Sequence, residues 1–305
     1  SASRDFMSAF STVDVDTTPW LSRLAATDAN CHLFPNAYSC DIQTVPTLER
    51  ALTEANQYAG GTFAASVSMV DIAHKLGYHV SWFSNQGHLG AADTPVTIVA
   101  EMSDRAEWTL QVINKPQYDE QLLDLLKTVP SDRNNLVVLH FKGSHFNYEN
   151  RFPPQWRTWG SEGNHDKILN YKNTIRYSDH VLESLFNYAK DHLNMHTFVY
   201  MSDHADVPDR HRQPNFGGYR DLRIPLVVWH SVHYAEKRPH RAAALRQNRA
   251  RYWTNDLLYE LMNGLMDADS NHFDEGFSLA SVHYSMERSD LTAVSGTIRI
   301  DGDNA

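Results

Sequence analysis

The sequence predicts an α/β protein, in which helices cover both faces of a mainly parallel central sheet. Four short apolar runs have the composition of buried strands, and helix-like segments lie between them. Polar residues follow three of these runs directly, as expected where the carboxyl ends of parallel strands carry a site. The candidate strands are residues 79–84 (HVSWFS), 135–141 (NLVVLHF), 197–203 (TFVYMSD) and 224–230 (IPLVVWH).

The segments between these runs have the spacing of helices. In residues 167–190 apolar side chains recur every three or four positions, which places them on one helical face. Thr254 is a candidate N-cap of a helix over 254–266, because its hydroxyl can accept an unpaired backbone N–H. The pattern is less regular after about residue 234, and we expect one domain over 1–305. The other candidate helices are residues 46–57, 69–76 and 119–129.

Composition narrows the possible classes of function. The formal net charge of −10 argues against nonspecific nucleic-acid binding, which needs a basic face to replace the counterions of phosphates. No apolar run approaches the ~20 residues that span a bilayer. The opening SASRDFMSAF lacks the basic start and apolar stretch of a signal peptide. We therefore expect a soluble domain without a nucleic-acid partner, whose membrane attachment lies outside these residues.

A carboxylate and an imidazole follow the strand candidate at 197–203. Asp203 and His204 can both reach one divalent cation, and oxygen with nitrogen ligands suits zinc. The alternative is an aspartate that caps a turn beside a surface histidine.

Two histidines mark the end of the strand candidate at 135–141. Gly143 allows a sharp turn, after which His145 projects above the sheet and can bind a phosphate, move a proton or hold a metal. For His140 we favour a core-edge histidine whose ring N–H is satisfied. The loop 147–160 that follows contains two tryptophans and two arginines, which suit a sugar or lipid headgroup or simply pack over the core edge.

A third segment brings a hydroxyl to the start of a helix. Thr44 precedes Pro46, which is tolerated in a first helical turn. Free N–H groups at such a junction favour an anionic phosphoryl group. Thr44 could also be a plain N-cap, and Thr47 is a competing hydroxyl. A fourth segment ends the strand candidate at 79–84 with two amides, Asn85 and Gln86, which suit phosphate or form a polar turn.

Taken together, these segments resemble bacterial phosphoethanolamine transferases, most closely the branch that acts on lipopolysaccharide core or similar acceptors. The likeness spans roughly residues 1–265, and its most specific marks are Asp-His after one strand and H-x-x-G-x-H after another. It implies an alkaline-phosphatase-like fold in a periplasmic catalytic domain, attached to the bacterial inner membrane by a separate N-terminal part. The motifs that carry it are DTTPWLSRL, QTVPTLERALTEAN, WFSNQ, VLHFKGSH, YMSDHAD and RIPLVVW.

The resemblance implies a role for six residues. Thr44 corresponds to the nucleophile that also binds zinc, and Asp203 and His204 correspond to zinc ligands. The substrate-binding positions are His145, His211 and Asn85.

Three departures from the family pattern bear on this assignment. The family has Gly-Glu-Ser at the end of its first strand, and the resemblance places this zinc-binding glutamate and its strand directly before Ser1. Without that glutamate, zinc should bind weakly and activity should be impaired. Ala205 and Asp206 stand where the family commonly has glycine and glutamate. Many relatives have several disulfides, whereas Cys31 and Cys40 can form at most one.

The implied function is a zinc-dependent transfer of phosphoethanolamine from phosphatidylethanolamine to a cell-envelope acceptor, through a covalent intermediate on Thr44. The acceptor would be lipid A, a lipopolysaccharide core sugar or another glycan. The alternatives are a phosphoglycerol transferase, a phosphodiesterase, or a non-catalytic envelope-binding domain that kept the fold. A sulfatase activity is disfavoured, because residues 44–48 (TVPTL) lack both the convertible cysteine or serine and the arginine of its motif.

Overall fold

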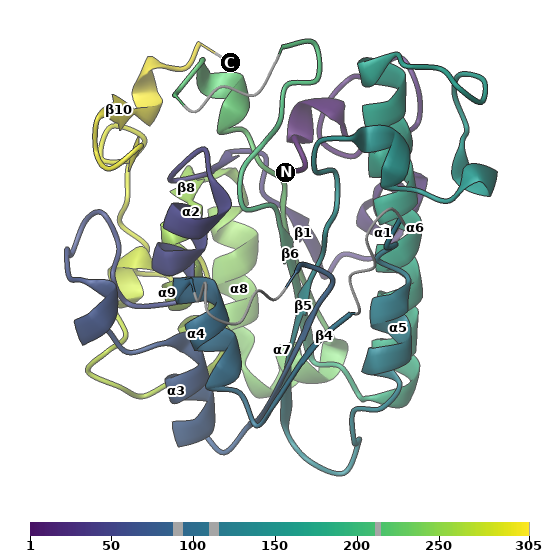
Figure 1. Ribbon diagram of the computed structural model, residues 1–305. Coiled ribbons are helices and arrows are strands. Elements are labelled where there is room, and N and C mark those ends of the chain that lie inside the picture. The colour runs from purple at the N-terminus through teal and green to yellow at the C-terminus, as the bar shows by residue number, and fades with distance from the viewer. Residues whose placement is uncertain (88–93, 110–115, 211–214, 305) are drawn as a thin grey trace.

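A computed structural model gives the structure of the chain and describes residues 1–87, 94–109, 116–210 and 215–304. Strands occupy the middle of the molecule and helices cover both of their faces (Figure 1). The N-terminus lies at one end of the strands (Figure 1). The α/β/α sandwich predicted from the sequence is therefore confirmed.

One half of the central layer is a parallel sheet. Its order is β4-β3-β5, with β3 spanning His79–Ser84, β4 Arg105–Trp108 and β5 Asn135–His140. β3 pairs in parallel with both neighbours, from His79 opposite Asn135 to Ser84 opposite His140 on the β5 side. The carboxyl ends of these strands therefore lie at one edge, where the sequence analysis expected functional groups.

The other half is a second three-stranded sheet of order β1-β7-β6. Here β7 (Leu226–His230) runs antiparallel to β1 (Cys31–Leu33) and to β6 (Thr197–Met201). β7 is buried throughout, which fits its continuous apolar sequence. Two short pairs complete the strands: β2 (Ala37–Tyr38) with β8 (Trp253–Thr254), and β9 (Thr292–Ala293) with β10 (Ile298–Arg299).

A cavity of about 680 Å³ separates the two halves. Residues all along β5 and β6 line it, together with side chains from the helices on both faces. Among the described residues, β5 pairs only with β3, and β6 pairs only with β7. Every residue of β5 and β6 is accordingly only half-buried. The cavity reaches the carboxyl ends of both strands, where Thr44 and Asp203 also line it.

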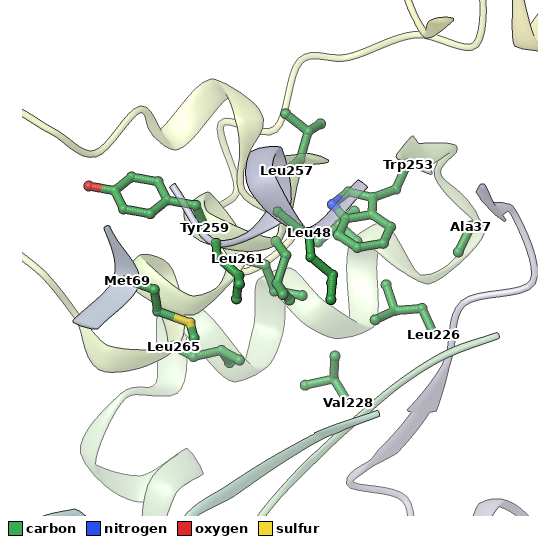
Figure 2. Packing of buried hydrophobic residues seen from close by; sticks show 14 of the residues in the cluster. Ala37, Leu48, Met69, Leu226, Val228, Trp253, Leu257, Tyr259, Leu261 and Leu265 are labelled. Carbon is green, nitrogen blue, oxygen red and sulfur yellow. The ribbon is translucent and has the colours of Figure 1, made fainter. Parts of the chain in front are cut away.

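The larger core lies between the sheets and one helical layer. Figure 2 shows its centre, where Leu48, Met69, Leu261 and Leu265 from three helices meet Val228 of β7. The helices of this side are α2 (Thr44–Ala51), α3 (Met69–Lys75), α4 (Pro95–Glu101), α8 (Pro239–Gln247) and α9 (Leu258–Met266), with α7 (Val232–Lys237) preceding α8.

The opposite face is covered by α1 (Pro19–Thr27), α5 (Gln121–Leu126) and α6 (Lys167–His192). α6 confirms the helix predicted over 167–190, and its buried residues include Tyr171, Ile175 and Leu182 on the predicted face. Asp166 caps it by accepting two backbone N–H bonds.

One detail differs from the sequence interpretation, and one question that it left open is answered. Thr254 is not the N-cap of α9: it lies in β8, and its hydroxyl contacts the Tyr58 hydroxyl at 2.6 Å. The Thr254 hydroxyl thus contacts a distant tyrosine and does not cap the following helix. Cys31 and Cys40 are both free and buried, so no local disulfide forms.

Candidate active site

Thr44 is the first residue of α2. The residue before it, Gln43, has extended backbone angles and makes no side-chain cap, so Thr44 is not the N-cap. Its hydroxyl instead donates a hydrogen bond of 2.6 Å to Oδ2 of Asp203. Thr47 is fully buried and its hydroxyl turns toward the Asp41 carbonyl. Thr44 is therefore the hydroxyl of this segment that lines the cavity.

Asp203 follows β6 and is held from two sides. Its Oδ2 accepts from Thr44, and its Oδ1 accepts from the Ser1 nitrogen at 2.8 Å. Burial opposes ionisation, but His204, the Ser1 nitrogen and the Thr44 hydroxyl outweigh it and hold the pKa of this carboxyl well below its usual range. Asp203 is therefore a carboxylate at neutral pH and attracts a cation.

His204 is fully buried beside that carboxylate. Its Nδ1 lies 2.8 Å from the Ala205 carbonyl, which can only accept, so the ring proton is on Nδ1. The opposite nitrogen, Nε2, lies 3.4 Å from Oδ2 of Asp203. The Ser1 hydroxyl is 3.4 Å from the same nitrogen.

Thr44, Asp203 and His204 thus bring a hydroxyl oxygen, a carboxylate and an imidazole nitrogen to one place. This donor set fits zinc, which takes such ligands in four-coordinate sites. Within the described ranges no group of three His, Cys, Asp or Glu side chains could hold a metal ion. For a metal ion, Asp203 and His204 are therefore the two strong ligands, and Thr44 adds a hydroxyl.

The two histidines around β5 have different environments. His140 Nδ1 lies 3.2 Å from the Ser84 hydroxyl, which confirms a core-edge histidine with a satisfied ring nitrogen. Burial lowers the pKa of His140 to about 4, so it is neutral at pH 7. His145 is half-buried, follows the left-handed Gly143 (φ 57°) and lines the cavity with its ring against Phe146.

Asn85 is buried and hydrogen-bonded to protein groups. Its Nδ2 donates to Oδ1 of Asp119 at 2.8 Å, and its Oδ1 accepts from the Thr109 hydroxyl at 2.6 Å. The amide thereby ties the end of β3 to its surroundings. His211 lies outside the described residues, so its assignment stays a prediction.

The structure adds a residue that sequence reasoning missed, Asp119. Its carboxylate accepts the backbone N–H groups of Lys142 at 2.7 Å and Gly143 at 2.8 Å, besides the Asn85 amide. Asp119 therefore fixes the turn that leads to His145. Its position in a helix-like segment gave no sign of this role.

Comparison with known proteins gives the family of the chain. A profile of the sulfatase family matches residues 1–267. Phosphoethanolamine transferase EptC of Escherichia coli K12 is 26% identical over 245 residues, which cover 73% of this chain and 42% of the relative. Phosphoethanolamine transferase EptA of Salmonella typhimurium is 26% identical over 285 residues, 85% of this chain and 50% of the relative. The chain thus spans about half the length of the curated relatives it matches.

Solved structures show the same fold. The C-terminal periplasmic domain of EptC from Escherichia coli, in complex with Zn, superposes with a TM-score of 0.86 at 22% identity, covering 99% of this chain and 90% of that domain. The soluble domain of lipooligosaccharide phosphoethanolamine transferase A from Neisseria meningitidis gives a TM-score of 0.76 at 18% identity, covering 92% and 89%. A protein of the alkaline phosphatase superfamily from Vibrio parahaemolyticus gives 0.65 at 16% identity, covering 95% and 69%. The chain has the alkaline-phosphatase fold and belongs to the sulfatase family, and the curated relatives described here are phosphoethanolamine transferases.

Proposed function

We propose that this chain is the catalytic domain of a transferase that moves phosphoethanolamine from phosphatidylethanolamine to a cell-envelope acceptor. The observation that carries the proposal is the Thr44 hydroxyl, which lines a cavity and donates to the Asp203 carboxylate beside Nε2 of His204. A hydroxyl in this setting suits nucleophilic attack on phosphorus. The relatives support phosphoethanolamine as the transferred group.

In the first half-reaction, Thr44 Oγ1 forms a bond to phosphorus and the bond from phosphorus to the diacylglycerol oxygen breaks. Thr44 loses a proton and the departing oxygen gains one, leaving phosphoethanolamine on Thr44. Asp203 is a weak base because its pKa is so low, so its part is to orient the Thr44 oxygen. His145 is the candidate to move the proton, since histidine titrates near neutral pH.

In the second half-reaction, a hydroxyl of lipid A, a core sugar or another glycan attacks the same phosphorus and releases Thr44. The acceptor hydroxyl loses a proton and Thr44 regains one. His211 and Asn85 complete the proposed substrate-binding set. For Asn85, substrate contact would require its amide to exchange a bond to Asp119 for one to substrate.

Zinc is the proposed cofactor, held by Asp203, His204 and Thr44. When bound, zinc lowers the pKa of a coordinated oxygen and offsets charge on phosphoryl oxygens. The EptC domain solved in complex with Zn supports this choice of metal.

We place the domain in the periplasm at the bacterial inner membrane, as for the periplasmic domain of EptC. In the described part of the chain, every helix is too short or too polar for a membrane span. We also propose that residues 1–305 form one domain and that the strand implied by the resemblance belongs between β5 and β6. The cavity along both strands supports this position.

The test is a transfer assay with the full-length protein, zinc, phosphatidylethanolamine and lipid A. The proposal predicts that the acceptor gains the mass of phosphoethanolamine, and that Thr44→Ala or a chelator abolishes the gain. Thr47→Ser, a conservative change at the buried neighbour, is the matched control and should keep activity. In a parallel assay with phosphatidylglycerol as the donor, gain of a glycerophosphate mass would identify a phosphoglycerol transferase instead. No transfer from phosphatidylethanolamine with folded, zinc-loaded protein would contradict the proposal.

A further inference from the structure

The loop after β5 carries two cations that the proposed chemistry does not use. Lys142 and Arg151 are half-buried, and within the described residues neither has a carboxylate at ion-pair distance. Arg151 donates from Nε and from one terminal nitrogen to the Phe146 carbonyl, at 3.3 and 3.2 Å. These two bonds tie the Arg151 side chain to the backbone of the loop. The other terminal nitrogen of Arg151 can donate to a further acceptor.

Asp119, a carboxylate that accepts from this loop's backbone, is already engaged. Its Oδ1 accepts from the Lys142 backbone N–H and from Asn85, and its Oδ2 accepts from the Gly143 N–H. The side-chain ammonium of Lys142 is not among its partners. Asp119 thus fixes the loop without neutralising the lysine by direct contact.

Ser144, between the two cations in sequence, is a second and independent sign of a ligand. Its side chain is buried at 1% exposure, and its hydroxyl has no hydrogen-bond partner in the described parts of the chain. A buried hydroxyl without a partner is uncommon and costs free energy. Ser144 lines the cavity together with Lys142, Thr44 and Asp203.

Electrostatics agrees with this geometry. Burial lowers the pKa of Lys142 and the nearby Arg151 lowers it further, while the charge of Asp119 acts in the opposite direction. Burial also lowers the pKa of Arg151, against the charges of Asp119 and Glu149. Because both pKa values are lowered, these carboxylates offset only part of the cost of two half-buried cations, and a bound anion would offset more of it.

We propose that Lys142, Ser144 and Arg151 form an anion subsite that binds a phosphate oxyanion of a substrate. A guanidinium fork, an ammonium and a hydroxyl are donors that suit phosphate oxygens. Which substrate supplies the phosphate rests on the proposed function: it is either the phosphate of the donor or a phosphate already present on the acceptor.

The first test measures binding without metal or turnover. The protein in EDTA and low salt is titrated with inorganic phosphate, phosphoethanolamine and glucose 1-phosphate, and affinity is read by calorimetry. Lys142→Gln and Arg151→Gln should each weaken phosphate binding about 10-fold or more, and Ser144→Ala by less. Lys127→Gln, a lysine paired with Asp124 on the surface, is the matched control and should bind as the parent does.

A stability measurement separates a binding role from a structural one. Without phosphate, Lys142→Gln should unfold at the same temperature as the parent or higher, because it removes repulsion with Arg151. Added phosphate should then stabilise the parent but not the variant. Unchanged phosphate affinity in Lys142→Gln and Arg151→Gln, or no phosphate binding by the parent, would overturn the subsite.

Single-turnover kinetics with full-length protein identifies the source of the phosphate. Slower loading of Thr44 in Lys142→Gln assigns the subsite to the donor, and slower discharge assigns it to the acceptor. Equal rates in both steps would overturn a role in substrate binding. If the parent never loads Thr44 but Lys142→Gln still loses phosphate affinity, the proposed function fails while the subsite stands.

Discussion

At the scale of single residues, the site depends on one hydrogen bond between distant parts of the chain. Thr44 and Asp203 are 159 positions apart, and their side chains meet at 2.6 Å because α2 begins at the end of β6. Each residue had a plausible local role, as a helix cap or a turn. The contact supports the nucleophile assignment over the cap.

Replacing Asp203 by Asn should slow loading of Thr44 by about 100-fold or more, because the charged acceptor that orients the hydroxyl is lost. The loading rate would be followed by intact-protein mass spectrometry under single-turnover conditions. Asp209→Asn changes an exposed carboxylate six positions away and is the matched control. Equal loading rates in the two variants would argue against the role of Asp203.

Asp119 makes a separate prediction about stability. Asp119→Asn replaces an acceptor-only carboxylate with an amide beside three N–H donors, and should lower the free energy of unfolding by about 1–3 kcal/mol. Urea denaturation measures this directly. Asp124→Asn, on the exposed side of α5, should change stability by less than about 0.5 kcal/mol. If Asp119→Asn leaves the free energy of unfolding unchanged, the carboxylate does not hold the turn.

At the scale of elements, β1 and β7 carry a buried histidine pair. Nε2 of His32 lies 3.3 Å from Nε2 of His230, so only one of the two nitrogens can hold a proton without repulsion. Burial and His230 lower the pKa of His32 to about 4, and burial also lowers that of His230. The pair is thus neutral in the folded protein at pH 7.

This pair predicts how stability depends on pH. Unfolded histidine binds a proton near pH 6.5, whereas folded His32 does so only near pH 4. The stability that the neutral, buried His32 contributes to the folded protein is therefore complete above about pH 6.5, and it is lost as the pH falls toward 4. Urea midpoints at pH 7 and pH 5 should differ less in His32→Gln than in the parent. If the two midpoints differ as much in His32→Gln as in the parent, His32 is not the cause of the pH dependence.

The elements also show what a sequence can and cannot predict. The runs at 79–84 and 197–203 predicted β3 and β6 because buried strands are continuously apolar, and the periodicity at 167–190 predicted α6. β1 and β2 are too short for such a signal. Arg151 was noted only as one of two arginines in the loop 147–160. Asp119 and Lys142 were missed because their roles arise only when β3, α5 and the loop after β5 come together.

At the scale of the whole molecule, the central layer is two sheets that face each other across a cavity. β5 and β6 are only half-buried along it, although both lie in the middle of the fold. Unpaired strand edges are uncommon in such a position, because backbone N–H and C=O groups need partners. It fits the strand that we propose between β5 and β6, which the resemblance places directly before Ser1.

The cavity predicts a ranking of local stability. In the 305-residue chain, amide protons of β5 and β6 that face the cavity should exchange with solvent faster than those of β7, which is buried throughout. Hydrogen exchange followed by NMR resolves these amides individually. Equal protection across all three strands would show that the cavity is closed to water.

The most direct test of the central claim is the intact mass of the full-length protein after incubation with phosphatidylethanolamine and zinc, followed by peptide mapping. We expect one phosphoethanolamine adduct, located on Thr44 and absent from Thr44→Ala. An adduct on Thr47, or none on a folded protein with zinc bound, would contradict the assignment of Thr44 as the nucleophile.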